Sequence, residues 1–187
     1  LALWLATREA CRVEVSLEHA DGSPVASATH TRALRVGQGL HLHLVQVTFE
    51  ADLQPGVWVG YRVWLSPSSS TDVRPNGWTD ATDAALCHAG RATPGFVYQP
   101  QVGALLHGSC RKPHHRRGGD GLVRADGHLA ELLAAPSAQE ASWPSALVLS
   151  GDQVYCDDVG GPMLRAIQGL ITAAGLPDEP LPGTAEA

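Results

Sequence analysis

The sequence predicts two units of different fold class, a β-sandwich over residues 1–100 and the first part of an α/β domain over residues 101–187. In the first unit, short apolar or alternating runs are separated by turn residues, with no convincing helix between them. In the second, strand and helix patterns alternate. A composition of 44% hydrophobic and 17% charged residues is that of a globular protein.

The first unit contains five predicted strands. They read "LALWLA", "CRVEVSLEH", "THTRALRVG", "LHLHLVQVTFEA" and "VWVGYRVWLS", with "ADGSP", "GQG" and "LQPG" as turns. Strands at intervals of roughly ten residues are typical of an antiparallel sandwich of immunoglobulin or fibronectin type III character. We expect Trp4, Trp58 and Trp64 to fill its core.

Two histidines lie two residues apart in the fourth of these strands. His41 and His43 face the same side of a strand, a geometry that can hold a metal ion. Because no third ligand stands near them in the sequence, the preferred interpretation is a solvated strand face.

The second unit begins with the predicted strand "QVGALLHGSC". Apolar residues at helical spacing follow in "DGLVRADGHLAELLAA", then a nearly all-apolar strand in "SALVLSGDQVY" and a helix with a glycine stop in "GPMLRAIQGLITAAG". This order predicts parallel strands buried under helices.

Polar residues follow both strands of this unit. In open α/β sheets, ligands bind outside the carboxyl ends of the strands. The first strand ends in His107, Ser109, Cys110 and Arg111, and the second in Asp152, Tyr155, Cys156, Asp157 and Asp158. If the strands are neighbours, Cys110 and Asp152 come together.

These residue types fit a metal site. Asp152 follows Gly151, which permits a tight turn, and a carboxylate can bridge two cations. A tyrosine with an ordinary pKa near ~10 becomes a ligand only for a strongly Lewis-acidic ion such as Fe(III), which makes Tyr155 a candidate for that metal. The thiolate of Cys110 suits iron or zinc. The alternative is that the aspartate only fixes a turn or caps a helix.

The windows "LLHGSCRKPHH" and "LVLSGDQVYCDD" resemble the PhoD-like metallophosphatases, the alkaline phosphatase D group of the calcineurin-like metallophosphoesterase superfamily. This resemblance implies an immunoglobulin-like domain followed by a metal-dependent phosphatase or phosphodiesterase domain, which hydrolyses phosphate esters with metal-activated water or hydroxide. It implies Cys110, Asp152 and Tyr155 as ligands of Fe(III), with Asp152 bridging to Ca²⁺ or another divalent ion. Cys156 stands where the relatives often have alanine.

The resemblance stops before the rest of the family site. The family completes its site with an asparagine and with later histidines and an aspartate, and nothing after Ile171 supplies them. We therefore expect only the first part of the catalytic domain, a fragment of doubtful activity alone. Its truncated sheet would have an unpaired edge prone to self-association. A non-catalytic β-sandwich module for binding or interaction, with a vestigial α/β segment, is the alternative function.

The basic loop "RKPHHRRGGDG" begins at Arg111, our candidate for contact with the phosphate, followed by His114 and His115. A merely solvated loop is the alternative. Asp157 and Asp158 are expected to cap the helix that begins near Gly161.

Net charge and cysteine usage exclude other classes of protein. A formal charge of -6 argues against nucleic-acid binding. No apolar run approaches the roughly 18 residues of a membrane span, and no signal peptide is visible, which favours the cytoplasm over secretion without fixing the location. The four cysteines, widely spaced, are expected to be reduced thiols, with Cys11 and Cys87 as ordinary small residues.

Overall fold

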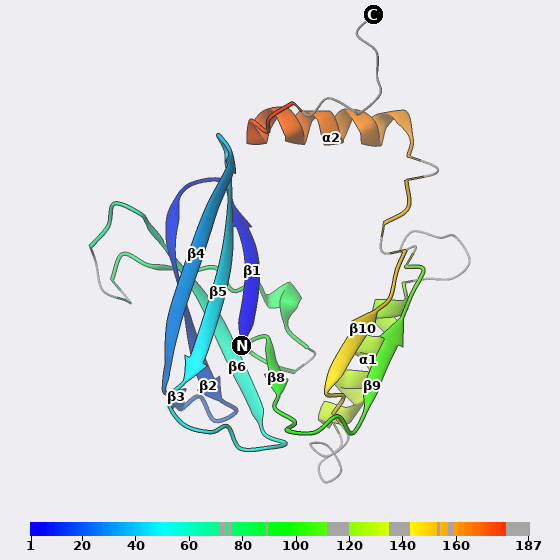
Figure 1. Ribbon diagram of the computed structural model, residues 1–187. Coiled ribbons are helices and arrows are strands. Elements are labelled where there is room, and N and C mark those ends of the chain that lie inside the picture. The colour runs from blue at the N-terminus through cyan, green and yellow to red at the C-terminus, as the bar shows by residue number, and fades with distance from the viewer. Residues whose placement is uncertain are drawn as a thin grey trace, which may run out of the picture.

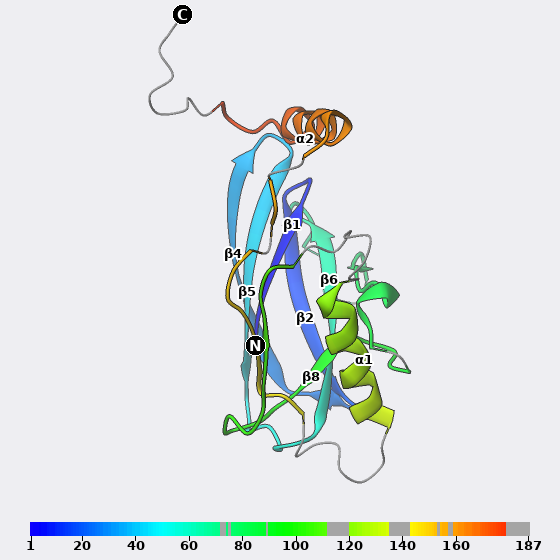
Figure 2. The ribbon, with the colours of Figure 1, turned by 90° about the vertical axis from the view of Figure 1, so that its right-hand side faces the viewer.

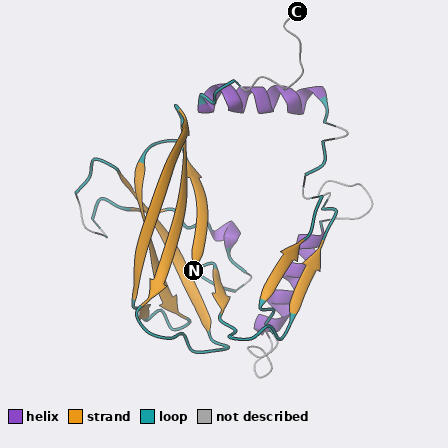
Figure 3. Ribbon diagram, in the orientation of Figure 1, coloured by secondary structure: helices purple, strands orange, loops and turns teal. Residues whose placement is uncertain are grey.

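The computed structural model describes residues 1–71, 74, 76–88, 90–111, 120–134, 143–152, 154–156 and 159–178. Within these residues the protein consists mostly of antiparallel β-strands, with two α-helices and one short 3-10 helix, Ala84–Leu86 (Figure 3). The prediction of a β-rich first half is confirmed, and its five predicted runs all contain strands.

Two antiparallel sheets form this half. The first has the order β1-β5-β4, with β1 (Ala2–Thr7), β5 (Leu40–Phe49) and β4 (Ser27–Gly37). The second has the order β3-β2-β6-β7, with β3 (Pro24–Val25), β2 (Cys11–His19), β6 (Trp58–Pro67) and β7 (Thr79–Asp80), and β8 (Gly95–Val97) also pairs with β6. Figures 1 and 2 show the two sheets packed face to face.

Both sheets contribute to one hydrophobic core. Alternate residues of β2 and β5 point into it, which is why these strands show a two-residue hydrophobic period. The buried members are Val13, Val15, Leu17, Val45, Val47 and Val59. Burial of these side chains, at about 1.5–3 kcal/mol for each, holds the two sheets together.

The expectation for the tryptophans is only partly right. Trp58 is buried, but in a separate cluster, and Trp64 is half-buried with its indole N–H donating to Ser16 Oγ over 2.9 Å. Trp4 is 68% exposed, so its placement in the core is wrong. The reason is the phase of β1, whose Leu3 and Leu5 face the core and turn Trp4 outward.

The second half has the predicted order of strand, helix, strand and helix. These elements are β9 (Leu105–Gly108), α1 (Gly121–Ala134), β10 (Ala146–Leu149) and α2 (Gly161–Ala174). Strands β9 and β10 pair in parallel, with Leu105 opposite Ala146 and Gly108 opposite Leu149. The expected burial is wrong for β10, because Leu147, Val148 and Leu149 are 42–48% exposed.

Helix α2 does not cover this sheet. Only its C-terminal end meets the tip of the β4–β5 hairpin, and the rest of the helix extends away from it (Figures 1 and 2). Most of its large apolar side chains are exposed. Gly39 N donates to Ala174 O over 2.9 Å and Gln38 N to Gly175 O over 3.3 Å. The hairpin therefore satisfies carbonyl groups at the end of α2, where Gly175 adopts the left-handed conformation expected of a helix stop.

A second cluster joins helix α1 to the first half. Trp58 and Trp143 are buried together, with Leu129 and Leu132 of α1 packed against them. The ring of His88 meets both tryptophans edge-on, at centroid distances of 6.0 and 5.7 Å. Its Nδ1 also lies 2.6 Å from Asp126 Oδ1 of α1. Aromatic packing and one polar contact thus dock α1 onto β6.

None of the helices described is long and apolar enough to cross a membrane. All four cysteines are free thiols, in line with the prediction.

Candidate metal centre

Backbone hydrogen bonds continue past the ends of β9 and β10. Ser150 N donates to Gly108 O over 3.0 Å, and Cys110 N donates to Gly151 O over 3.1 Å. Because the strands are parallel and in register, these bonds hold the two strand tips side by side.

The side chains of Cys110 and Asp152 meet at these tips. The Sγ atom of Cys110 lies 3.2 Å from Oδ2 of Asp152, and both residues are exposed. Ser109 Oγ lies 3.5 Å from the same sulfur and 3.4 Å from Gly151 O, to which it donates. The predicted meeting of Cys110 with Asp152 is confirmed.

The backbone at both residues is left-handed. Cys110 has a φ of 55° and Asp152 a φ of 51°, and within the described residues they are the non-glycine positions with positive φ. Such conformations cost about 1–3 kcal/mol each and cluster at functional sites. Gly151, between the strand and Asp152, has a φ of 155°, in agreement with the tight turn predicted there.

The separation of sulfur and oxygen suits a shared ion. Using zinc distances of about 2.3 Å to sulfur and 2.0–2.2 Å to a carboxylate oxygen, two ligands of one tetrahedral ion lie about 3.5 Å apart. The observed 3.2 Å needs little adjustment. Over the residues described, no three His, Cys, Asp or Glu side chains gather into a metal-binding group. Tyr155 is half-buried three residues after Asp152, and its role as the third ligand stays a prediction.

Arg111 forms an ion pair at the edge of this site. Its Nε and Nη2 donate to the two carboxylate oxygens of Asp120 over 3.1 and 2.7 Å, and hydrogen bonding to this carboxylate raises the pKa of Arg111. Asp120 also accepts a hydrogen bond from Leu122 N, 3.0 Å away, in the first turn of α1. The third guanidinium nitrogen, Nη1, is not part of this ion pair. Contact of Arg111 with phosphate stays a prediction.

One side-chain contact at the strand tips was not predicted from the sequence. His107 Nε2 and Ser150 Oγ lie 2.8 Å apart, joining β9 to the residue after β10. Only the register of two strands about forty residues apart reveals this contact, because nothing local links the two side chains.

Several predicted residues lie outside the described part of the chain. These are His114, His115, Asp157 and Asp158. Helix α2 does begin at Gly161, where Gly160 is the N-cap residue and makes no side-chain capping bond. Cys156 is exposed.

The prediction of a solvated face for the histidine pair in β5 is wrong. His43 is only 1% exposed, and its side chain lies between the two sheets. Burial, together with the charge of nearby His41, lowers the pKa of His43 below its ordinary value of 6.5. The face with His41 and His43 continues into Val45 and Val47, which are core residues.

Comparisons with known proteins identified no protein similar to this chain. No family model matches the sequence, and searches of curated proteins and of solved structures found no match.

Proposed function

We propose that this chain carries part of the active site of a metal-dependent phosphatase or phosphodiesterase of the PhoD-like type. In this proposal the two antiparallel sheets are an immunoglobulin-like or fibronectin III-like domain, and the segment from β9 to α2 is the first part of the metallophosphoesterase domain. The contact between Cys110 and Asp152 carries the proposal, because it joins two ligand types at the carboxyl ends of neighbouring parallel strands.

Each residue of the site has a role that its chemistry permits. Cys110 offers a thiolate, and Asp152 offers two oxygens and so can serve one ion or bridge two. Tyr155 adds a hard phenolate ligand on the same strand tip. Fe(III) with Ca²⁺ or another divalent ion, held by these residues, would supply the Lewis acidity that activates water and polarises a phosphoryl oxygen.

Arg111 would position the phosphate ester. Its ion pair with Asp120 fixes the guanidinium at the end of β9, where Nη1 can donate to a phosphate oxygen. Because Asp120 also caps α1, the same carboxylate sets the position of both the helix and the arginine.

Hydrolysis of a chromogenic phosphodiester, after reconstitution with iron and calcium, tests this function. Because the chain carries only part of the active site, we expect weak metal-dependent turnover. This turnover should be lost in Cys110→Ala and Asp152→Asn and retained in Cys156→Ala, a change at a nearby exposed thiol that serves as the control. Arg111→Ala is expected to raise KM about tenfold or more with metal content unchanged. Equal activity in the wild type and in the Cys110 and Asp152 variants would contradict the proposal.

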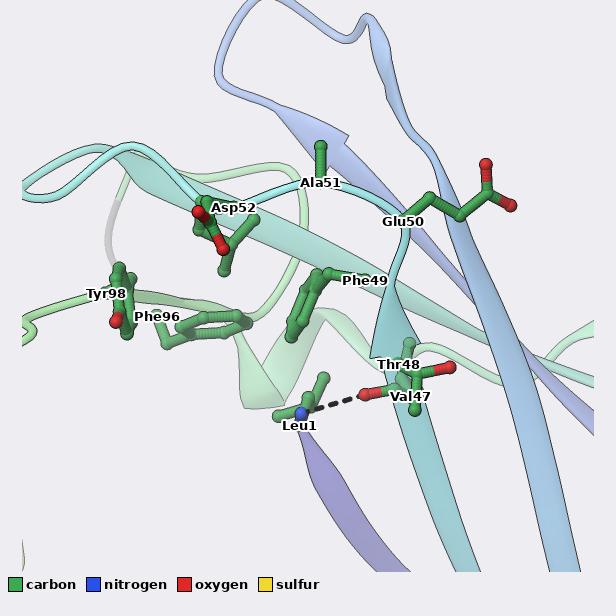
Figure 4. Close-up of a pocket in the computed structure, with 10 residues that line it drawn as sticks. Leu1, Val47, Thr48, Phe49, Glu50, Ala51, Asp52, Phe96 and Tyr98 are labelled. Carbon is green, nitrogen blue, oxygen red and sulfur yellow. Dashed lines mark hydrogen bonds between the residues drawn. The ribbon is translucent and has the colours of Figure 1, made fainter.

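A binding module is the second candidate, and one cavity favours it. A cavity of about 800 Å³ opens in the first half, where Phe49, Phe96 and Tyr98 lie around it, with Asp52 beside them and Leu1 N donating to Val47 O over 3.0 Å (Figure 4). Aromatic side chains beside a few polar groups, as found here, are typical of ligand sites. This candidate predicts that Cys110→Ala and Asp152→Asn leave ligand binding to the sandwich unchanged.

A further inference from the structure

The two sheets leave an open end where β1 passes into β2. Strand β1 ends at Thr7 in one sheet and β2 begins at Cys11 in the other, so the chain crosses between the sheets here. A cavity of about 580 Å³ lies beside this crossing, and Thr7, Cys11, Leu65 and Thr79 are among the residues that line it.

A thiol and an imidazole face each other at this end. Cys11 Sγ lies 3.8 Å from Nε2 of His43, which comes from the opposite sheet. Zinc binds sulfur at about 2.3 Å and imidazole nitrogen at about 2.0–2.1 Å, so two such ligands of one tetrahedral ion lie about 3.5 Å apart. The pair is therefore within about 0.3 Å of the separation that a shared ion requires.

The hydroxyl of Thr7 lies beside both atoms. It donates to Glu9 O over 2.7 Å and so accepts from His43 Nε2, 2.9 Å away. Its oxygen also lies 3.7 Å from Cys11 Sγ. An ion that enters from the cavity replaces this hydrogen bond with stronger bonds to nitrogen and sulfur.

His41 is the natural third ligand. It lies two residues before His43 on the same face of β5, opposite Thr7 of β1 in the strand pairing. Its side chain is half-buried, and binding requires it to rotate toward the pair. Since no three such ligands already converge among the residues described, His41 must make this rotation when the ion binds.

We infer that Cys11, His43 and His41 form a second metal site, specific for zinc or another thiophilic divalent ion, at the open end between the two sheets. Water takes the fourth position, next to Cys11, which also lines the cavity. The thiol proton of Cys11 leaves to solvent on binding, and the proton on Nε2 of His43 moves to Nδ1, which has no hydrogen-bond partner among the described residues in either tautomer.

This site is independent of the proposed phosphatase function. It uses residues of the first half only, whereas Cys110 and Asp152 belong to the strand tips of the second. The 187-residue chain with Cys110→Ser and Asp152→Asn therefore tests this site separately from the strand tips.

Cobalt(II) titration of that double variant tests the inference, because a thiolate ligand gives cobalt a charge-transfer absorption band. We expect one equivalent of cobalt to bind with this band and zinc to displace it. Adding Cys11→Ser removes the band and the equivalent, and adding His41→Gln weakens binding at least tenfold. Cys87→Ser, a change at another half-buried thiol, leaves binding unchanged.

Two outcomes would overturn the inference. One is a double variant that binds no cobalt, and the other is a thiolate band that survives Cys11→Ser. Cys11→Ser is a near-isosteric change at a partly exposed side chain, and an unchanged circular dichroism spectrum confirms that the variant folds. Binding in the wild type that depends only on Cys110 and Asp152 would refute this site and leave the strand-tip proposal standing.

Discussion

Cys110 and Asp152, 42 positions apart in the chain, lie in side-chain contact, and each has a left-handed backbone. Neither a strand end nor a turn requires a cysteine or an aspartate in this conformation, because glycine adopts it at lower cost. Backbone strain of this kind is typical of functional sites, and here it directs both side chains toward one point.

Two substitutions of Cys110 test whether its left-handed backbone is strained. Cys110→Gly is expected to raise the free energy of unfolding by about 1 kcal/mol, because glycine adopts a φ of 55° without steric cost. Cys110→Val is expected to lower it by a similar amount, since a β-branched residue is a poor fit for this conformation. Urea denaturation measures both changes. Two equally destabilised variants would show that the left-handed backbone is not strained.

The contact between the β4–β5 hairpin and the C-terminal end of α2 predicts that substitution of Gly37 lowers stability. A Cβ atom on Gly37 would collide with Ala174 O, so Gly37→Ala is expected to cost about 1–3 kcal/mol and to release α2 from the hairpin. Hydrogen exchange at the amides of Gln38 and Gly39 reports this release.

The matched control lies in α2 itself. Nothing approaches a Cβ at Gly169, so Gly169→Ala is expected to stabilise the helix by up to about 1 kcal/mol and leave the exchange at Gly39 slow. Faster exchange at Gly39 in the control, or unchanged exchange in Gly37→Ala, would contradict this role of the contact between the hairpin and α2.

The aromatic cluster predicts that Trp143 couples α1 to the first half. Trp143→Ala removes a buried ring that meets Trp58 and His88 edge-on, and should cost about 3–5 kcal/mol. Thermal denaturation measures the loss. Val123→Ala, at a side chain of α1 that is 69% exposed, is the control and should change stability by less than about 0.5 kcal/mol.

His43 predicts how stability depends on pH. Its folded-state pKa is lowered by burial, so below about pH 6.5 the unfolded chain binds a proton that the folded chain does not. The free energy of unfolding therefore falls as the pH drops from 6.5 toward the folded pKa of His43, and then levels off.

Melting temperatures at pH 7.5 and 5.5 measure this effect. His43→Leu should reduce the difference between the two pH values, whereas the change His30→Leu at an exposed residue of β4 should not. An undiminished pH dependence in His43→Leu would mean that another group causes it.

The sequence was sufficient to predict where most elements lie. Alternation in β2 and β5, the helical spacing of leucines in α1 and the glycine stop at Gly175 all act over a few residues, and the structure agrees with them. Parallel pairing of β9 with β10 followed from their order, and it was enough to bring Cys110 and Asp152 together.

Burial was harder to predict, because it depends on which side of a strand meets the other sheet. In β5 the leucines at 40, 42 and 44 suggest one phase and the valines at 45 and 47 the opposite one. The valine phase faces the core, so Leu44 is exposed and His43 is buried. The contact of His43 with Cys11, 32 positions away and in the other sheet, could not follow from local pattern at all.

Metal analysis of the purified chain tests the central claim most directly. After expression with iron and calcium supplied, the protein is analysed by inductively coupled plasma mass spectrometry beside Cys110→Ser, Asp152→Asn and, as control, Cys156→Ser. We predict that iron copurifies with the wild type and the control and is lost from the two strand-tip variants. A wild type as free of iron as both variants, or variants that retain as much iron as the wild type, would contradict the claim that these strand tips hold a metal ion.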